Sequence, residues 1–468
     1  MTVAMGGYTS SGYPKAVAQA LVQRKEAGEA FKINLVTGAN VGSLDTMLAR
    51  ADLVNRRAPL IESREMAQLV NRGSVCYIEQ PMNRMPQLLR SRAFGNIDVA
   101  VIEAIKITKE GHVVPSSSVG MIQYFVDMAD AVIIELNVAQ PSELEGMHDI
   151  YHAGSPPNRK PIPLTGVKER IGEPFIRVNP EKVKYIVKSE ILDDTAQWSV
   201  DDKTAQLLTA NLLNFLELEL SRQRRTRLPP LQTGFGNLAD AIVRSLERSN
   251  FQDLEFFCGI LQEANMELVA KGKVKAASTG SIHMTPRVIE LLKQHPQLMK
   301  ETVVIRNNEI TNNSEVISRL GPISLLSGIE VDIYGNVNVS HIGGNRVVNG
   351  IGGAANFAHN ASLTIVLLPS ETGGGNISTI VPMVTHHDIC EHDVDVIITE
   401  HGVADLRGKG DVERAFAIIQ QCAGSYKEQL LDYLRRAVAE VGGHHPHILS
   451  EVFAWHQRLK ETGSMRMG

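Results

Sequence analysis

The 468-residue sequence has few cysteines and none of the paired spacings that form disulfide frameworks or thiolate metal sites. Its four cysteines stand far apart, at positions 76, 258, 390 and 422, and no CxxC motif occurs. Disulfide-rich secreted domains and thiolate zinc sites depend on closer, paired cysteines. We therefore expect a protein of a reducing compartment, the cytoplasm.

Long apolar runs are also missing. No stretch approaches the roughly 18 apolar residues that a membrane-spanning helix needs. The opening residues, MTVAMGGYTS, lack the charged and apolar regions of a signal peptide. The run TVAMGGY has the composition of a strand at residue 2, where a preceding helix would be expected to cover the sheet, so we expect the natural start to lie upstream. The sequence predicts no membrane association.

No excess of basic charge is present. The chain carries 47 lysines and arginines against 52 acidic residues, so it offers no broad cationic surface for nucleic acid. The one dense basic cluster, SRQRRTRLPP (221–230), follows a leucine-rich helical pattern and ends in two prolines. We interpret it as the exposed end of a helix that leads into a linker. A phosphate-binding patch is the alternative.

The sequence does contain a regular alternation of short Val/Ile-rich runs with helical segments. This alternation is typical of an α/β fold with mostly parallel, buried strands. The predicted strands include FKINLVTG, GSVCYIE, IDVAVIEA and AVIIELN in the first half, and VKAAS, TVVIR, SLTIVLL and DVDVIITE in the second.

Two segments resemble each other and suggest two related domains. GNIDVAVIEA (95–104) and HDVDVIITEHG (392–402) each place a strand before a glutamate, Glu103 or Glu400. With the linker near residue 225, the repeat predicts two similar open α/β domains, at 1–225 and 226–468. Open α/β sheets bind ligands at the carboxyl ends of their strands, where both glutamates fall.

The segment NGIGGAANFAHNASLTIVLL (349–368) matches the dinucleotide pattern GxGxxA. The next predicted strand begins within about ten residues, which leaves no room for the crossover helix of a βαβ unit. We therefore expect a glycine turn whose amides approach an oxyanion or a phosphate. A purely structural turn is the alternative.

The segment THHDICEHDVD (385–395) gathers histidines and acids without a zincin motif. His387 and Glu391 could share one face of a helix, but two ligands without a third make a poor metal site. We expect no metal there. Further along, Glu400 follows a predicted strand and is a candidate general acid or base, and no GxSxG motif supports a Ser-His-Asp site.

Taken together, these strings resemble the acetyl-CoA hydrolase/CoA-transferase family. The resemblance runs from TVAMGGYTSSGYPKAV through FGNIDVAVIEA, LQTGFGN and GIEVDIYGNVN to EHDVDVIITEHGVADLRG and GGHHPHILSEVFAWHQRL. It implies two similar open α/β domains with the active site between them, coenzyme A thioesters and carboxylic acids as substrates, and a homodimer.

The resemblance also implies roles for particular residues. In the family a glutamate attacks the acyl-CoA carbonyl and then carries CoA as a thioester. The oxyanion loops correspond to LQTGFGN and NGIGGAAN, which place Phe235, Gly352, Gly353 and Ala354 at the carbonyl. Asn312 and Glu400 fall where the family keeps an active-site amide and a second carboxylate.

The chain departs from the family at the nucleophile. Where relatives carry a pattern like Y-[ST]-E-V-L-Q-[DE], this sequence reads FCGILQE, so Gly259 stands at the glutamate position. Two nearby loops also differ: SETGGGN (370–376) replaces a lysine-bearing loop, and GGAANF (352–357) replaces a GGSGDF-like turn.

Three interpretations follow from the missing nucleophile. The protein could hydrolyse acyl-CoA without a glutamyl adduct, with Glu400 or another acid positioning water. Cys258 could accept the acyl group instead, although a free cysteine in an apolar run is usually a buried hydrophobic residue. The third interpretation is a protein that binds a CoA-like ligand and catalyses nothing.

Overall fold

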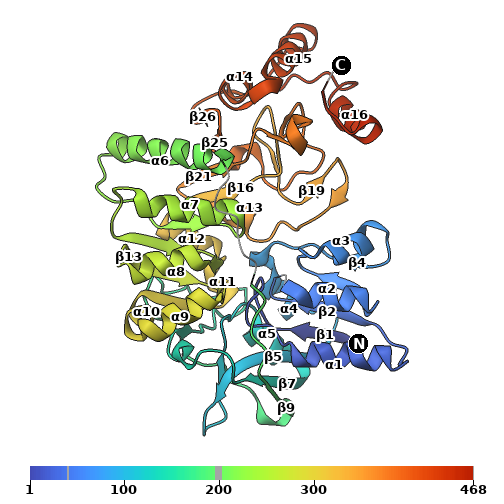
Figure 1. Cartoon of the computed structure of the whole chain (residues 1–468), viewed down its shortest axis with the longest axis vertical. Helices are drawn as coiled ribbons and strands as arrows, with labels where there is room; N and C mark the ends of the chain where they lie inside the picture. Colours follow the sequence, from blue (N-terminus) through green and yellow to red (C-terminus); the bar gives the residue numbers. More distant parts are fainter. Residues whose placement is uncertain (40–41, 196–202, 467–468) are drawn as a thin grey trace.

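The computed structural model describes residues 1–39, 42–195 and 203–466, which form two mostly parallel sheets with helices packed around them. Figure 1 shows the first sheet and its helices at the lower right and the second sheet and its helices along the left side and above, with the C-terminal helices at the top and strand β9 near the bottom. The predicted α/β class is confirmed, and each strand predicted above lies in one of these sheets.

The first sheet has the order β4-β3-β2-β1-β5-β7-β9, with β6 antiparallel to β5. Its strands are β1 (Thr2–Met5), β2 (Ile33–Thr37), β3 (Val54–Ala58), β4 (Cys76–Tyr77), β5 (Ile97–Ile107), β6 (Val113–Pro115), β7 (Ala129–Asn137) and β9 (Val183–Ser189). The accompanying helices are α1 (Ala16–Glu26), α2 (Gly42–Arg50), α3 (Arg64–Asn71), α4 (Met85–Arg90) and α5 (Ile122–Met128).

The second sheet has the order β26-β25-β21-β16-β10-β11-β13-β15-β8. Its strands are β8 (His148–Asp149), β10 (Leu231–Thr233), β11 (Leu254–Phe257), β13 (Val274–Thr279), β15 (Val303–Arg306), β16 (Ile323–Ser327), β21 (Leu363–Leu367), β25 (Val396–Thr399) and β26 (Gly402–Asp405). All pair in parallel except β26, which turns back on β25.

Helices surround the second sheet and extend beyond it. They are α6 (Lys203–Gln223), α7 (Asn237–Arg248), α8 (Glu263–Ala270), α9 (Pro286–Gln294), α10 (Pro296–Thr302), α11 (Asn308–Thr311), α12 (Ser314–Leu320), α13 (Ala354–Asn360), α14 (Asp411–Cys422), α15 (Lys427–Glu440) and α16 (Ala454–Thr462). Side-chain caps fix the N-termini of two of these helices. The Thr285 side chain accepts a hydrogen bond from the Val288 amide at the start of α9, and the Asn313 side chain accepts from the Val316 amide at the start of α12.

Short strands connect these layers. They are β12 (Ile260–Leu261), β14 (Ser281–Ile282), β17 (Glu330–Asp332), β18 (Val337–Asn338), β19 (His341–Ile342), β20 (Arg346–Val347), β22 (Glu371–Thr372), β23 (Ile377–Ser378) and β24 (Ile380–Val381). Single 3₁₀ turns are η1 (Met82–Arg84), η2 (Ser142–Leu144), η3 (Pro180–Lys182), η4 (Gly373–Gly375), η5 (Glu391–Asp393) and η6 (Gly424–Tyr426).

Two segments from before residue 225 contact the second sheet. β8 pairs with β15 at its edge, and α6 packs on β25 and β26 next to α7. Leu212 and Leu216 of α6 are buried there, and Asn211 donates to the carbonyl of Thr399. Both segments lie before the predicted domain boundary at residue 225 although they contact the second sheet, and that boundary stays a prediction.

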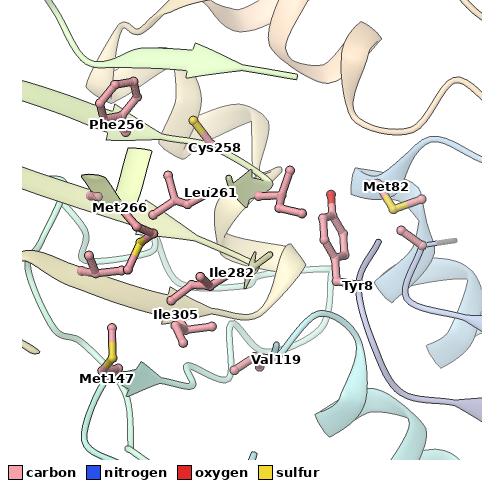
Figure 2. Packing of buried hydrophobic residues seen from close by; sticks show 14 of the residues in the cluster. Tyr8, Met82, Val119, Met147, Phe256, Cys258, Leu261, Met266, Ile282 and Ile305 are labelled. Atoms are coloured by element: carbon pink, nitrogen blue, oxygen red, sulfur yellow. The ribbon is translucent and has the colours of Figure 1, made fainter. Parts of the chain in front are cut away.

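One large apolar cluster joins the two sheets. It contains Tyr8 and Phe125 from the first part of the chain and Phe256 and Leu261 from the second. Figure 2 shows the Tyr8 ring among these buried side chains, beside Met82. Burial of such apolar surface is the main stabilising contribution to folding, so the two sheets hold each other in place.

In the part of the chain that the structure describes, no helix combines the length and the apolar character needed to cross a bilayer.

Candidate active site

A cavity of about 200 Å³ lies where segments of the two sheets meet. From the first part of the chain it is lined by Tyr8, Thr9, Ala39, Leu60, Glu62 and Met82. From the second part it is lined by residues 232–235, 259–260, 326–327, 339, 349–354 and 357. It therefore brings together the two glycine-containing loops and Gly259, which are far apart in sequence.

Gly259 follows strand β11 and faces a tyrosine from the other sheet. A β-carbon added to Gly259 would lie 2.7 Å from the hydroxyl oxygen of Tyr8. Tyr8 is held in a tight turn after β1, in which its amide and carbonyl exchange hydrogen bonds with Ser11. The tyrosine hydroxyl thus occupies the space where a side chain at position 259 would begin.

The environment of Tyr8 keeps its hydroxyl protonated. Its side chain is buried, and that burial, followed by the negative charge of Glu62, raises the pKa of the hydroxyl well above the usual tyrosine range. Tyr8 lines the cavity, so its protonated hydroxyl can donate a hydrogen bond to a ligand there.

The glycine loop at 349–354 approaches the first sheet closely. A β-carbon on Gly350 would lie 2.5 Å from the Tyr77 hydroxyl, and one on Gly352, whose φ is +53°, would lie 3.1 Å from Leu60. The Met82 amide donates to the Gly352 carbonyl at 3.0 Å. Glycine is needed here because the backbone itself forms the cavity wall.

Asn312 reaches this loop from behind. A β-carbon on Gly353 would lie 2.5 Å from the Asn312 side-chain nitrogen. That nitrogen is buried and has no hydrogen-bond partner among the described residues, whereas the Asn312 oxygen accepts from Thr311. Asn312 does not line the cavity itself but a separate hollow, with Asn83 and Arg159, so its role as the active-site amide stays a prediction.

Comparison with known proteins identifies the family. The model of the acetyl-CoA hydrolase/transferase N-terminal domain matches residues 1–191, and that of the C-terminal domain matches residues 290–434. The chain belongs to the acetyl-CoA hydrolase/transferase family. The predicted family and enzyme class are confirmed: this is an acyl-CoA-processing enzyme.

Full-length relatives carry both activities in their names. A succinyl-CoA:acetate CoA-transferase of Clostridium kluyveri is 40% identical, covering 100% of this chain and 87% of that protein. An acetyl-CoA hydrolase of Schizosaccharomyces pombe is 36% identical over 99% of this chain and 93% of its own. A propanoyl-CoA:succinate CoA transferase of Escherichia coli is 36% identical, with 99% and 95% covered.

Solved structures share the fold at low identity. RipA from Yersinia pestis superposes with a TM-score of 0.73 at 17% identity, over 92% of each chain. A 4-hydroxybutyrate CoA-transferase from Porphyromonas gingivalis has a TM-score of 0.63 at 19% identity, over 93% of each chain. Both matches support the CoA-transferase type of fold.

The two oxyanion loops predicted from the family resemblance both line the cavity. Phe235 does so from the turn between β10 and α7, where its ring meets His283 edge-on at 5.3 Å. The neighbouring Gly236 has a φ of +113° and donates to the Gln262 side chain at 3.0 Å. Gly352, Gly353 and Ala354 line the opposite loop, where the Ala354 amide is already bonded to the Ile351 carbonyl.

Cys258 is next to the cavity in sequence but points away from it. Its sulfur lies 3.4 Å from the Thr233 amide and 3.5 Å from the Leu231 carbonyl, inside the sheet. Burial raises the pKa of the Cys258 thiol to about 11. Figure 2 shows its side chain directed away from Tyr8, and Cys258 is not among the cavity-lining residues. This position does not suit an acyl acceptor.

Glu400 is also placed elsewhere. It follows β25 as predicted, but its carboxylate accepts from the Ser370 amide at 2.9 Å and the Ser370 hydroxyl at 2.6 Å. His401 lies 3.5 Å away. Glu400 does not line the cavity, so its catalytic role stays a prediction. Glu103, the other strand-end glutamate, is buried beside Lys15 and likewise does not line the cavity.

Sequence reasoning missed Tyr8 and Glu62. Both come from the first sheet, and neither stands in a recognisable motif. A glycine pair before Tyr8 marks the turn after β1, but nothing local connects position 8 or 62 to position 259. Among the described residues that line the cavity, Glu62 is the one that carries a carboxylate.

Proposed function

We propose that this protein hydrolyses short acyl-CoA thioesters by direct attack of water, without a glutamyl-CoA intermediate. The observation that carries the proposal is the Tyr8 hydroxyl at the place where a side chain on Gly259 would start. With Gly259 there, the chain has no carboxylate at that position to form an anhydride, and the space for one is filled.

The geometry supports a role for Tyr8 in stabilising the oxyanion, and the family resemblance adds Asn312, whose side-chain nitrogen lies behind Gly353. As water adds to the thioester carbonyl, negative charge develops on the carbonyl oxygen. Hydrogen bonds from the Tyr8 hydroxyl and the unpartnered Asn312 nitrogen would then be stronger than in the ground state.

Glu62 is the proposed general base. Its carboxylate takes a proton from the attacking water while the oxygen–carbon bond forms. When the tetrahedral intermediate collapses, the carbon–sulfur bond breaks and Glu62 returns the proton to the CoA sulfur. The products are the free carboxylic acid and CoA, and the enzyme is regenerated without a covalent intermediate.

The cavity supports small acyl groups. Its volume of about 200 Å³ is below the range typical of pockets for drug-sized ligands, so it suits the acyl end of the substrate and not the whole CoA molecule. The proposal therefore covers acetyl and propionyl groups, with the CoA moiety leading to the surface. We also propose, from the family resemblance, a cytoplasmic homodimer with carboxylic acids as further ligands.

Three measurements test the proposal. Acetyl-, propionyl- and succinyl-CoA are incubated with the enzyme, with and without acetate, and free CoA is measured. We expect CoA release that does not depend on acetate, and no protein-bound thioester reducible by borohydride. In a single turnover in ¹⁸O-water, the label should enter the product acid and not Glu62. Label in Glu62 would show that it is a nucleophile, and absence of any turnover would favour a non-catalytic ligand-binding protein.

A further inference from the structure

A histidine, a cysteine and a glutamate outside the cavity lie together on one loop. The ligand atoms of His387, Cys390 and Glu391 all lie within 4.8 Å of one another. The Cys390 sulfur is 3.8 Å from the Glu391 carboxylate. His387 is exposed, whereas Cys390 and Glu391 are half-buried, so solvent and ions can reach all three.

From the sequence, His387 and Glu391 are two ligands that could share a helix face, and without a third ligand no metal is expected. The structure has no α-helix in this segment: the loop runs from β24 to the 3₁₀ turn η5, and Cys390 directly precedes that turn. The bend of the loop brings Cys390 to the other two. Cys390 therefore supplies the third ligand that the sequence pattern alone did not indicate.

The backbone of the loop is fixed on both sides of the cluster. The Ile389 amide donates to the Val337 carbonyl, and the Glu391 amide donates to the Asn336 side chain at 3.0 Å. The Glu391 carbonyl accepts from Arg414 at 2.7 Å. Cys390 and Glu391 are thus presented on a rigid backbone, and only the exposed His387 side chain has to adjust.

We propose that His387, Cys390 and Glu391 bind a zinc ion. Thiolate, imidazole and carboxylate are the three ligand types that Zn²⁺ accepts, at roughly 2.0–2.3 Å. Tetrahedral geometry requires these atoms to approach by about 1 Å from their present spacing, which a rotation of His387 allows. A thiolate and a carboxylate together neutralise the charge of the ion.

The fourth position has a candidate within reach. His392 is 78% exposed, and its ring nitrogen lies 3.8 Å from the Glu391 carboxylate. Water is the other possible fourth ligand. The variant His392→Ala, titrated with Zn²⁺ in the same way, distinguishes them, because loss of His392 weakens binding only if its ring is a ligand.

The proposed site is connected to the cavity through Asp388. This residue stands between the ligands, and its carboxylate accepts from the Val339 amide and the Ser340 hydroxyl, both at 2.7 Å. Val339 lines the cavity. A zinc ion bound by His387 before Asp388 and by Cys390 and Glu391 after it would therefore stiffen the loop that supports this part of the cavity wall.

The experiment uses the full chain without a histidine tag, stripped with a chelator and titrated with Zn²⁺ in a calorimeter. Co²⁺ serves as a second probe, because a thiolate ligand gives it a characteristic charge-transfer absorption. We expect one strong site per chain, a rise in melting temperature on Zn²⁺ addition, and a Co²⁺–thiolate band. Cys390→Ser should weaken binding at least about tenfold and remove that band.

The controls separate this site from adventitious binding. Cys76→Ser removes another accessible cysteine and should leave binding unchanged. His444 and His445 both lie near Asp411 and could bind zinc by themselves, so the double variant His444→Ala/His445→Ala is also measured. No binding, binding unaffected by Cys390→Ser, or binding lost only in the His444/His445 variant would each overturn the proposal. Circular dichroism of each variant verifies that it is folded.

Discussion

The hydroxyl oxygen of Tyr8 lies 2.7 Å from the point where a β-carbon on Gly259 would begin. The two residues come from different sheets, 251 positions apart in the chain. Their contact shows what fills the space that a side chain at position 259 would occupy. A bulky neutral side chain fills the space, and the acid that lines the cavity, Glu62, comes from the first sheet.

Restoring the family nucleophile should therefore require two changes. Gly259→Glu alone forces its β-carbon against the Tyr8 hydroxyl, and overpacking of this kind destabilises a protein by about 1–3 kcal/mol. We expect a lower melting temperature and no transferase activity. The double variant Tyr8→Ala/Gly259→Glu should recover stability relative to Gly259→Glu and form a borohydride-reducible thioester with acyl-CoA.

The matched control is Tyr8→Ala alone, which empties the space without adding a carboxylate. It should form no thioester. If Gly259→Glu by itself forms the adduct at full stability, Tyr8 does not occupy the space as described.

Tyr8→Phe removes only the hydroxyl. Loss of one oxyanion donor costs about 100-fold or more in kcat, and we expect such a loss in CoA release with little change in KM. Because the pKa of Tyr8 is raised, its ionisation should cause no loss of wild-type activity up to about pH 10, the ordinary tyrosine value. Tyr185→Phe, on the exposed edge strand β9, is the control and should behave as wild type.

Glu62→Gln keeps the size of the side chain and removes its basicity. General bases contribute about 100-fold or more, so hydrolysis should fall by at least that factor while acyl-CoA binding remains. The comparison variant is Glu65→Gln, which lies on α3 and pairs with Arg50 at the surface. Equal activities of the two variants would remove Glu62 from the mechanism.

The Cys258 thiol should be unreactive toward alkylating reagents in the folded protein. With a thiol pKa of about 11, only about one molecule in a thousand carries the thiolate at pH 8. Iodoacetamide should therefore modify the exposed Cys76 and leave Cys258 unmodified until the protein unfolds, as peptide mass spectrometry can show. Cys258→Ala should retain most of the hydrolytic activity; its complete loss in a folded variant would revive the acyl-acceptor hypothesis.

His148 should make stability depend on pH. Burial lowers the pKa of this histidine from 6.5 to about 4, so in that window the unfolded chain binds more protons than the folded one. The contribution is present above pH 6.5 and is lost as the pH falls toward 4, by at most about 3 kcal/mol. Urea unfolding of His148→Gln and wild type should show a smaller loss of stability on acidification in the variant.

His447 also has a lowered pKa, of about 4, and is present in both proteins, so the difference between them isolates His148. Parallel pH curves for the two proteins would contradict this assignment. The side chain of glutamine retains a donor for the Ser116 carbonyl, which His148 contacts at 2.8 Å.

Local patterns were sufficient for the strands and for the glycine turns. Buried parallel strands need continuous Val/Ile-rich runs, so segments such as IDVAVIEA and DVDVIITE were recognisable. The expectation that no helix fits between residues 349–354 and the next strand was wrong, because the short helix α13 lies there and contacts the parallel strands β16 and β21. Gly350 and Gly352 do form a turn that lines the cavity. The approach of Cys390 to His387 and Glu391 could not be predicted, because the loop amides are fixed by hydrogen bonds to distant residues, Val337 and Asn336.

By itself, the sequence determined the α/β class, the family and the absence of a carboxylate at position 259, since each depends on residue identity or short-range periodicity. Only the tertiary structure decided what stands in that place. The positions of Tyr8 and Glu62 at the cavity, the turning of Cys258 into the sheet and the distance of Glu400 from the cavity all result from packing between segments far apart in the chain. No local pattern encodes such contacts, because they arise from how two buried surfaces fit together.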